Sequence, residues 1–181
     1  MVLLILGLIL WSGSHLFKRL FPGMRAAMGD AGKGVVALGS LIAIVLMVIG
    51  YRNAEVVQLW NPPAILTHVN NLLMVLALYL FASSGAKTWI TTKIRHPQLT
   101  AVKIWVVAHL LVNGDLASLV LFGGILAWAV VSVILINRSG EVWQPELGWP
   151  LKNEVQVVIG TVVMLAVIGF IHNWLGYWPF G

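Results

Sequence analysis

The amino-acid sequence predicts an all-α, polytopic membrane helix bundle with six transmembrane helices. Of its 181 residues, 60% are hydrophobic and only 9% are charged, whereas soluble globular domains carry about 25% charged residues. The mean hydropathy is +0.94. The apolar residues form six runs that approach the ~20 residues needed to cross a bilayer, and the basic residues lie mainly in alternate loops. We therefore expect residues 1–181 to form a single transmembrane domain.

The six predicted spans follow one another with short connections. The first three cover residues 2–17, 35–50 and 64–83. The fourth starts at Pro97, which suits the first turn of a helix because proline lacks an N–H, and ends at Asn113-Gly114. The fifth starts at Asp115, a favoured N-cap residue, and ends at Ile136, and the sixth covers residues 155–174.

The basic residues set the predicted orientation of these spans. Lys18 and Arg19 follow the first apolar run instead of preceding it, which favours a retained helix over a signal peptide. With six spans, ten of the eleven Lys and Arg residues fall on one side of the membrane, and only Arg52 falls on the other. By the positive-inside rule both termini then face outward, which is the periplasm for a bacterial inner membrane. The expected surroundings are a lipid bilayer and no nucleic acid.

Several chemistries are excluded or left without a motif. The chain has no cysteine, which excludes disulfides, iron–sulfur clusters, c-type haem attachment and cysteine nucleophiles. The sequence has no Walker-type loop, dinucleotide fingerprint or recognisable nucleophile–base pair. We expect Gly123-Gly124 and Gly169 to serve close helix packing. Three acidic residues are expected in one solvated loop: Glu141, Glu146 and Glu154.

Two histidines within the apolar segments are the main candidates for function, because an ionisable group in a spanning helix is costly. His15 lies in the inner half of the first predicted span, and His109 lies about twelve residues into the fourth, ~18 Å along the helix axis. We expect both in the inner half or the middle of the bilayer, where they can face one another. Two opposed imidazoles are the ligands that a bis-histidine haem b needs. The alternative is that each simply hydrogen-bonds a neighbouring helix.

Other residues complete the predicted haem site. Trp105, one turn before His109, is expected to flank the macrocycle. Asn113, at i+4 from His109, and the serines Ser12 and Ser14 near His15 are candidates to hold the imidazole rings in place. The basic residues expected near the inner face, where they can pair with haem propionates, are Lys18, Arg19, Arg95 and Lys103.

A second candidate site lies toward the outer surface. His68 comes early in the third predicted span and His172 late in the sixth, and Asn71 is at i+3 from His68. This spacing predicts a polar stripe that faces the bundle interior and binds a second haem, a metal or a polar substrate. The alternative, favoured for His172, is an interfacial histidine satisfied by water.

Two further polar residues lie at predicted helix starts. His96 is expected at the capping position before Pro97, as a helix start at the lipid headgroups. The alternative is that Arg95 and Gln98 contact an anionic group, such as a lipid phosphate or a propionate. Asp115 is expected to cap the fifth helix, and a proton-relay role is the weaker alternative.

Four motifs carry a resemblance to a known family: Trp11-Ser12-Gly13-Ser14-His15-Leu16-Phe17, Leu66-Thr67-His68-Val69-Asn70-Asn71-Leu72, Arg95-His96-Pro97-Gln98 and Ala108-His109-Leu110-Leu111-Val112-Asn113-Gly114-Asp115. With them the chain resembles the NnrU family over essentially its whole length. The resemblance implies a link to bacterial denitrification and to the handling of nitrite and nitric oxide. The chain is also similar to plant and cyanobacterial 15-cis-zeta-carotene isomerases, which use a redox-responsive haem b with histidine ligands. Their motif histidines correspond to His15 and His109 here, so the resemblance strengthens the expectation of haem b. The isomerases are longer, and their polyene substrate is not implied.

Three functional hypotheses follow. The first is a haem-b membrane protein that serves denitrification by electron transfer or nitric oxide handling, with a reductase or a quinone as partner. The second is a haem-dependent isomerase of a polyene or isoprenoid lipid. The third is a haem-free transporter or an assembly factor for a reductase.

Overall fold

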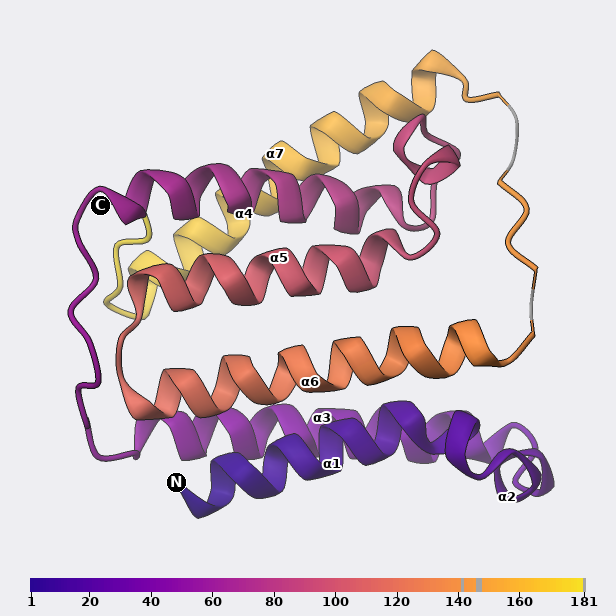
Figure 1. Cartoon of the computed structure of the whole chain (residues 1–181), viewed down its shortest axis with the longest axis horizontal. Coiled ribbons are helices and arrows are strands. Elements are labelled where there is room, and N and C mark those ends of the chain that lie inside the picture. Colours follow the sequence, from indigo (N-terminus) through magenta and orange to yellow (C-terminus); the bar gives the residue numbers. More distant parts are fainter. Residues whose placement is uncertain (141, 146–147, 181) are drawn as a thin grey trace. The chain divides into compact units, whose positions relative to one another are not determined.

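The computed structural model describes residues 1–140, 142–145 and 148–180, and its regular structure is helical (Figure 1). In chain order the elements are α1 (Val2–Leu20), α2 (Pro22–Ala27), α3 (Ala31–Arg52), α4 (Leu66–Ser83), the 3₁₀ helix η1 (Ile90–Thr92), α5 (Pro97–Val112), α6 (Leu116–Arg138) and α7 (Leu151–Trp174). Within the described ranges, β pairing is limited to one isolated bridge between Gln58 and Asp115. The all-α prediction is confirmed for this part of the chain.

Five of the described helices are long and apolar enough to cross a membrane: α1, α3, α4, α6 and α7. The fourth predicted span corresponds to α5, which has 16 residues. At 1.5 Å per residue it is about 24 Å long, whereas the hydrocarbon core of a bilayer is about 30 Å thick. The chain is therefore a multi-pass helical membrane protein by helix length and composition. The count of six spans and the outward termini stay predictions.

Helix boundaries differ from the predicted spans where polar residues continue a helix. The first helix continues from the predicted end at Phe17 to Leu20, and α2 is a short helix that the hydropathy pattern does not indicate. Pro22 occupies the first turn of α2, a position that tolerates the missing N–H. The last helix begins at Leu151, four residues before the predicted start. Its first turn contains Glu154, and hydropathy alone does not distinguish such a turn from a loop.

Large apolar side chains are exposed on the outer faces of the helices. Val2, Leu72 and Phe170 are each at least 70% exposed, and many other Leu, Ile and Val residues are more than 40% exposed. A monomeric soluble protein rarely exposes continuous apolar surface of this kind. Lipid chains can cover these side chains at no hydrophobic cost, which agrees with helices that face a bilayer.

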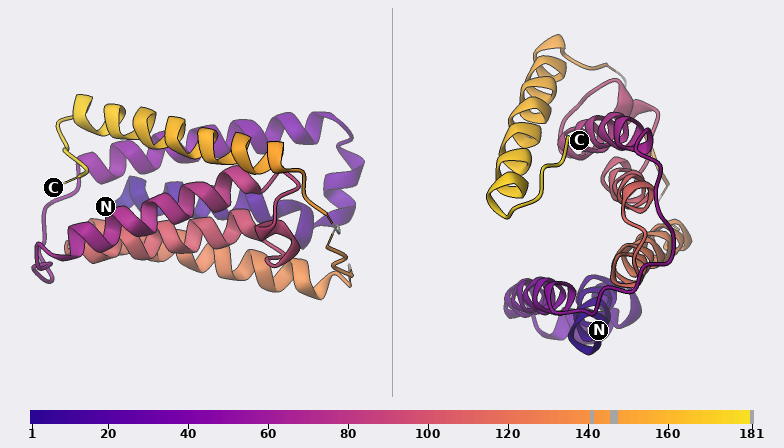
Figure 2. Two further views of the ribbon diagram at one scale, coloured as in Figure 1. Left: turned by 90° about the horizontal axis from the view of Figure 1, so that it is seen from above. Right: turned by 90° about the vertical axis from the view of Figure 1, so that its left-hand side faces the viewer.

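The first of two compact units comprises residues Met1–Trp60 and Gly114–Ser139, with α1, α2, α3 and α6. Helices α1 and α3 lie side by side and are joined through α2 (Figure 2). Their backbones approach closely at Gly50, where a Cβ atom would collide with the backbone of Leu4. On α6, a Cβ at Gly124 would meet Leu8, whereas a Cβ at Gly123 would meet nothing within 4 Å. The packing role predicted for this glycine pair is confirmed for Gly124 and is wrong for Gly123.

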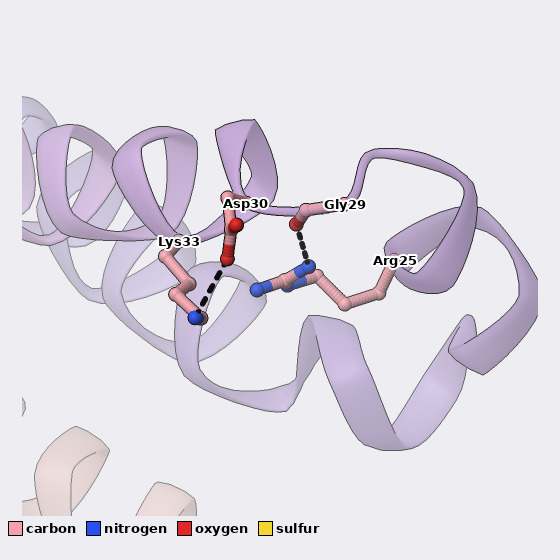
Figure 3. A network of polar contacts seen from close by, with 4 residues as sticks. All are labelled: Arg25, Gly29, Asp30 and Lys33. Atoms are coloured by element: carbon pink, nitrogen blue, oxygen red, sulfur yellow. Dashed lines mark hydrogen bonds and ion pairs between the residues drawn. The ribbon is translucent and has the colours of Figure 1, made fainter.

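The turn between α2 and α3 lies at a basic end of this unit. The Arg25 guanidinium donates a hydrogen bond to the carbonyl of Gly29 over 2.8 Å, and the Lys33 ammonium pairs with Asp30 over 2.7 Å (Figure 3). The Lys33 and Asp30 side chains are 76% and 94% exposed, so this ion pair contributes less than about 1 kcal/mol. Lys18 and Arg19 lie in the last turn of α1, just before this turn. Basic residues thus gather at this end of the unit, as expected where positive charges set the orientation of the helices in the membrane.

The second unit comprises Asn61–Asn113 and Gly140–Gly181, with α4, η1, α5 and α7. Helix α4 packs against both α5 and α7. The start of α4 and the ends of α5 and α7 lie at one end of this unit (Figure 1). A Cβ at Gly169 would meet the ring of Phe180 at 2.9 Å, so this glycine makes room for the segment that follows α7, and its predicted packing against another helix stays a prediction.

Candidate functional site

The His15 ring is held between two tryptophans in the first unit. Its Nδ1 lies 2.9 Å from the carbonyl oxygen of Trp11, four residues earlier on α1. The Trp11 ring lies beside the imidazole, with the ring centroids 3.9 Å apart and the planes tilted by 31°. The Trp128 ring on α6 approaches edge-on, with centroids 5.1 Å apart and planes at 73°. An imidazole that donates from Nδ1 carries its lone pair on Nε2, the tautomer that ligates a metal through Nε2.

The His109 ring in the second unit has the same local arrangement. Its Nδ1 lies 2.9 Å from the carbonyl oxygen of Trp105, again four residues earlier on the helix. The two rings are 5.0 Å apart and tilted by 52°, so Trp105 lies beside His109, while its expected contact with a macrocycle stays a prediction. His109 lies in the last turn of α5. His15 and His109 belong to different units, so the expectation that the two rings face one another stays a prediction.

The groups that hold the imidazoles are not the side chains that the sequence suggested. Asn113 donates from Nδ2 to the carbonyl oxygen of His109 over 2.8 Å, so it closes the end of α5 and does not contact the ring nitrogen. The Ser14 hydroxyl lies against α3, where a Cβ at Gly39 would meet it at 2.5 Å. Each imidazole is held instead by the backbone carbonyl four residues earlier on its own helix: His15 by that of Trp11 and His109 by that of Trp105.

The predicted basic partners lie at different distances along the helices. Lys18 and Arg19 follow His15 by one turn in the last turn of α1. Lys103 lines a shallow pocket of about 350 Å³ on α4 and α5 together with Leu73, Thr100, Ile104 and Val107. Lys103 is six residues from His109, about 9 Å along the axis, whereas Arg95 precedes α5, whose first residue is already about 18 Å from His109 along the axis. Of the two basic residues in the second unit, Lys103 is thus the nearer to His109.

The second candidate site is rearranged within the second unit. Asn70 is only 8% exposed, and its Oδ1 is buried with no hydrogen-bond partner among the described residues. Its Nδ2 donates to Asn71 Oδ1 over 3.2 Å, and Asn71 Nδ2 donates to the carbonyl of Phe180 over 3.3 Å. His68 is exposed. The expectation that His68 faces the interior is therefore wrong, and Asn70 takes the interior position. Asn70 is two residues after His68, and two residues along a helix rotate a side chain to nearly the opposite face.

His172 lies in the last turn of α7 at the same end of the second unit. Its Nδ1 is 2.8 Å from the carbonyl of Ile168. The position four residues before His172 is an isoleucine, so this histidine has the backbone contact of His15 and His109 without their tryptophan. Among the described residues, no group of three or more His, Asp or Glu side chains is placed to hold a metal ion.

The Gly114-Asp115 turn has a structural explanation. The Gly114 carbonyl accepts hydrogen bonds from the backbone N–H groups of Leu59 and Trp60 over 2.8 and 3.1 Å. Asp115 accepts the backbone N–H of Ser118 over 2.9 Å and the Ser118 hydroxyl over 2.6 Å, which confirms the predicted N-cap. His96 occupies the N-cap position of α5, as predicted. The fourth motif, residues 108–115, therefore includes residues that build the start of α6.

Glu154 has a structural role that sequence reasoning missed. The predicted solvated loop is wrong for Glu154, while Glu141 and Glu146 lie outside the described residues. Glu154 Oε2 accepts the hydroxyl of Tyr79 over 3.1 Å, and Oε1 accepts the backbone N–H of Trp89 over 2.5 Å. Asn153 donates to the carbonyl of Lys87 over 3.1 Å. The first turn of α7 thereby fastens the segment between α4 and α5.

Replacing Glu154 with alanine is expected to loosen this segment. The change removes the acceptor of the part-buried Tyr79 hydroxyl, at about 1–3 kcal/mol, and the acceptor of the exposed Trp89 N–H, which water can replace. We expect several-fold faster trypsin cleavage after Lys87, Lys93 and Arg95, measured by mass spectrometry of the detergent-solubilised protein. Gln156→Ala, at an exposed position half a turn further along, is the matched control. Equal cleavage in the two variants would contradict the role assigned to Glu154.

Comparison with known proteins identifies the family. A family model described as NnrU protein matches residues 3–179 of the chain, and the chain belongs to the NnrU family. No curated protein gives a significant match, and no solved structure does so.

Proposed function

We propose that this chain is an integral membrane haem-b protein of denitrification, with His15 and His109 as the two axial ligands of the iron. The observation that supports this most is the repeated arrangement of the two histidines. Each follows a tryptophan by four residues, each directs Nδ1 at that tryptophan's carbonyl over 2.9 Å, and each lies beside the indole ring. One such histidine occurs in each of the two units.

The donor set suits a porphyrin. Four of the six iron ligands of a haem come from the macrocycle, so the protein has to supply only one imidazole to each face. A neutral imidazole whose Nδ1–H is held by a carbonyl has a fixed orientation and a more basic Nε2, as metal-binding histidines usually do. The indoles beside the two rings supply apolar aromatic surface of the kind that lines cofactor sites. Haem b, when bound, supplies one-electron redox chemistry.

The basic residues have a defined part in this proposal. Lys18 and Arg19 end α1 one turn beyond His15, where their charges can pair with carboxylates of the cofactor. In the second unit Lys103 takes the same part, because it lies about two turns from His109. Arg95 lies at the far end of α5 from His109, so we assign it to the loop and not to the cofactor.

The role in denitrification rests on the family. NnrU membership supports a membrane protein that serves nitrite or nitric oxide metabolism. His15 and His109 would hold the haem, whose one-electron chemistry would suit electron transfer or the handling of nitric oxide. We propose a reductase or a quinone as the electron partner.

Purification from haem-replete cells tests the proposal. We expect a Soret band and, on reduction with dithionite, sharp α and β bands, with about one haem b per chain by the pyridine haemochrome assay. Preparations of His68→Ala should keep this spectrum, because His68 is exposed and outside the proposed ligand pair. A colourless protein from haem-replete cells that is otherwise folded would rule out the proposal.

A further inference from the structure

The environment of His15 contains an element that its ligand role does not require. Trp11, His15 and Trp128 form a compact cluster, here named the His15 clamp. Besides the two contacts to the imidazole, the two indoles touch one another, with centroids 5.4 Å apart and planes at 77°. Trp11 and His15 belong to α1 and Trp128 to α6, within the same unit. The clamp therefore fixes the imidazole against a second helix.

The two indoles do not take part in hydrogen bonding in the described structure. The Nε1–H groups of Trp11 and Trp128 are both buried and have no hydrogen-bond partner among the described residues. A buried, unsatisfied donor costs roughly 1–3 kcal/mol, and a phenylalanine would avoid this cost. What the indoles contribute at this position is the size and the orientation of their aromatic surfaces.

The contacts restrict the imidazole in two independent ways. The bond from Nδ1 to the Trp11 carbonyl fixes the tautomer and the direction of Nε2. The tilted contact with Trp11 and the edge contact with Trp128 then restrict rotation of the ring about its last side-chain torsion, which is otherwise broad for histidine. Trp11 is on the same helix turn as His15 and moves with it. Trp128 is the residue of the clamp through which α6 contacts the imidazole.

We propose that Trp128 is a positioning residue that sets the plane of the His15 imidazole and, through it, the electronic state of the iron. The second half of this statement rests on the proposed haem ligation, whereas the first half concerns the protein alone. The orientation of an axial imidazole plane influences the splitting of the iron d orbitals, and hence the g-values of a low-spin ferric haem. Trp128 acts through the imidazole that it contacts.

The first arm of the test uses the haem-free protein with ¹⁵N- and ¹³C-labelled histidine. A ring in contact with two indoles experiences their ring currents, so we expect the His15 ring-proton resonances to be displaced from those of the exposed His68. In Trp128→Ala these resonances should shift from their wild-type positions, and in Trp128→Phe they should shift less. Unchanged resonances in Trp128→Ala would overturn the clamp whether or not the protein binds haem.

The second arm uses the haem-loaded protein and electron paramagnetic resonance. We expect Trp128→Ala to shift or broaden the largest g-value, and Trp128→Phe to restore it in part. Trp174→Ala is the control, because Trp174 is 77% exposed at the end of α7. A second supporting result is that Trp128→Ala loses haem while Trp128→Phe retains it, with the same melting temperature in both variants. A wild-type g-value in Trp128→Ala would overturn the link to the iron, while absence of haem from the wild type would refute the proposed function alone.

Discussion

Replacing His15 or His109 with alanine is expected to abolish the six-coordinate haem spectrum. Each change removes one axial ligand, and the remaining imidazole leaves a five-coordinate, high-spin iron or no haem at all. Loss of a partner that only orients a metal ligand already lowers metal affinity 10–100-fold, so loss of the ligand itself should lower it by at least about 100-fold. Haem content per chain and the shift of the Soret band measure both effects. The double variant should be colourless.

His172→Ala is the matched control for these two variants. His172 makes the same contact to the carbonyl four residues earlier, over 2.8 Å, but that residue is Ile168 and not tryptophan. We expect the spectrum of the wild type in this variant. Imidazole added to His15→Ala or His109→Ala should restore part of the six-coordinate spectrum by filling the vacated position. A wild-type spectrum in His15→Ala would refute His15 as a ligand, and a wild-type spectrum in His109→Ala would refute His109.

The second large effect is expected for Gly114→Ala. Gly114 is buried, and a Cβ at this position would collide with the backbone carbonyl oxygen of Trp60. A backbone atom cannot yield as a flexible side chain does, and the Gly114 carbonyl is held by two N–H groups of the same segment. The turn and residues 59–60 must therefore separate, with a loss of about 3 kcal/mol or more. Thermal unfolding in detergent, followed by circular dichroism, measures it.

Gly123→Ala provides the contrast for this prediction. A Cβ at Gly123 meets nothing within 4 Å, and the residue lies within α6. Replacing a glycine in a helix interior with alanine gains about 0.5–1 kcal/mol, so this variant should melt at the same temperature or slightly higher. If the two alanine variants unfold at the same temperature, the close approach of Gly114 and Trp60 does not contribute as described.

Much of the fold could be predicted because lipid imposes a simple pattern on the sequence. A helix in a bilayer must satisfy its own backbone and present apolar side chains, so composition alone locates α3, α4, α6 and α7 to within a few residues. The Asp115 cap was predictable because its partner is local, at i+3. The early start of α7 could not be predicted, because Glu154 in its first turn accepts hydrogen bonds from residues that are 65 and 75 positions away in the sequence.

The candidate site was predictable in its residues and less so in its contacts. The spacing of Trp105 and His109 indicates that they share a helix face, and the rings do lie 5.0 Å apart. Trp128 escaped because it comes from another helix, and no sequence spacing relates it to His15. Asn70 escaped because the stripe was assigned to His68 and to Asn71 at i+3, whereas the structure buries Asn70. Residues that act across helices need coordinates, whereas residues that act within one turn do not.

Near-infrared magnetic circular dichroism of the oxidised protein tests the central claim most directly, because the energy of its charge-transfer band depends on the pair of axial ligands. We predict the band of a bis-histidine low-spin ferric haem in the wild type and in His172→Ala, and its loss in His15→Ala and in His109→Ala. A band typical of another ligand pair, or a bis-histidine band that survives either of the last two changes, would contradict axial ligation by His15 and His109.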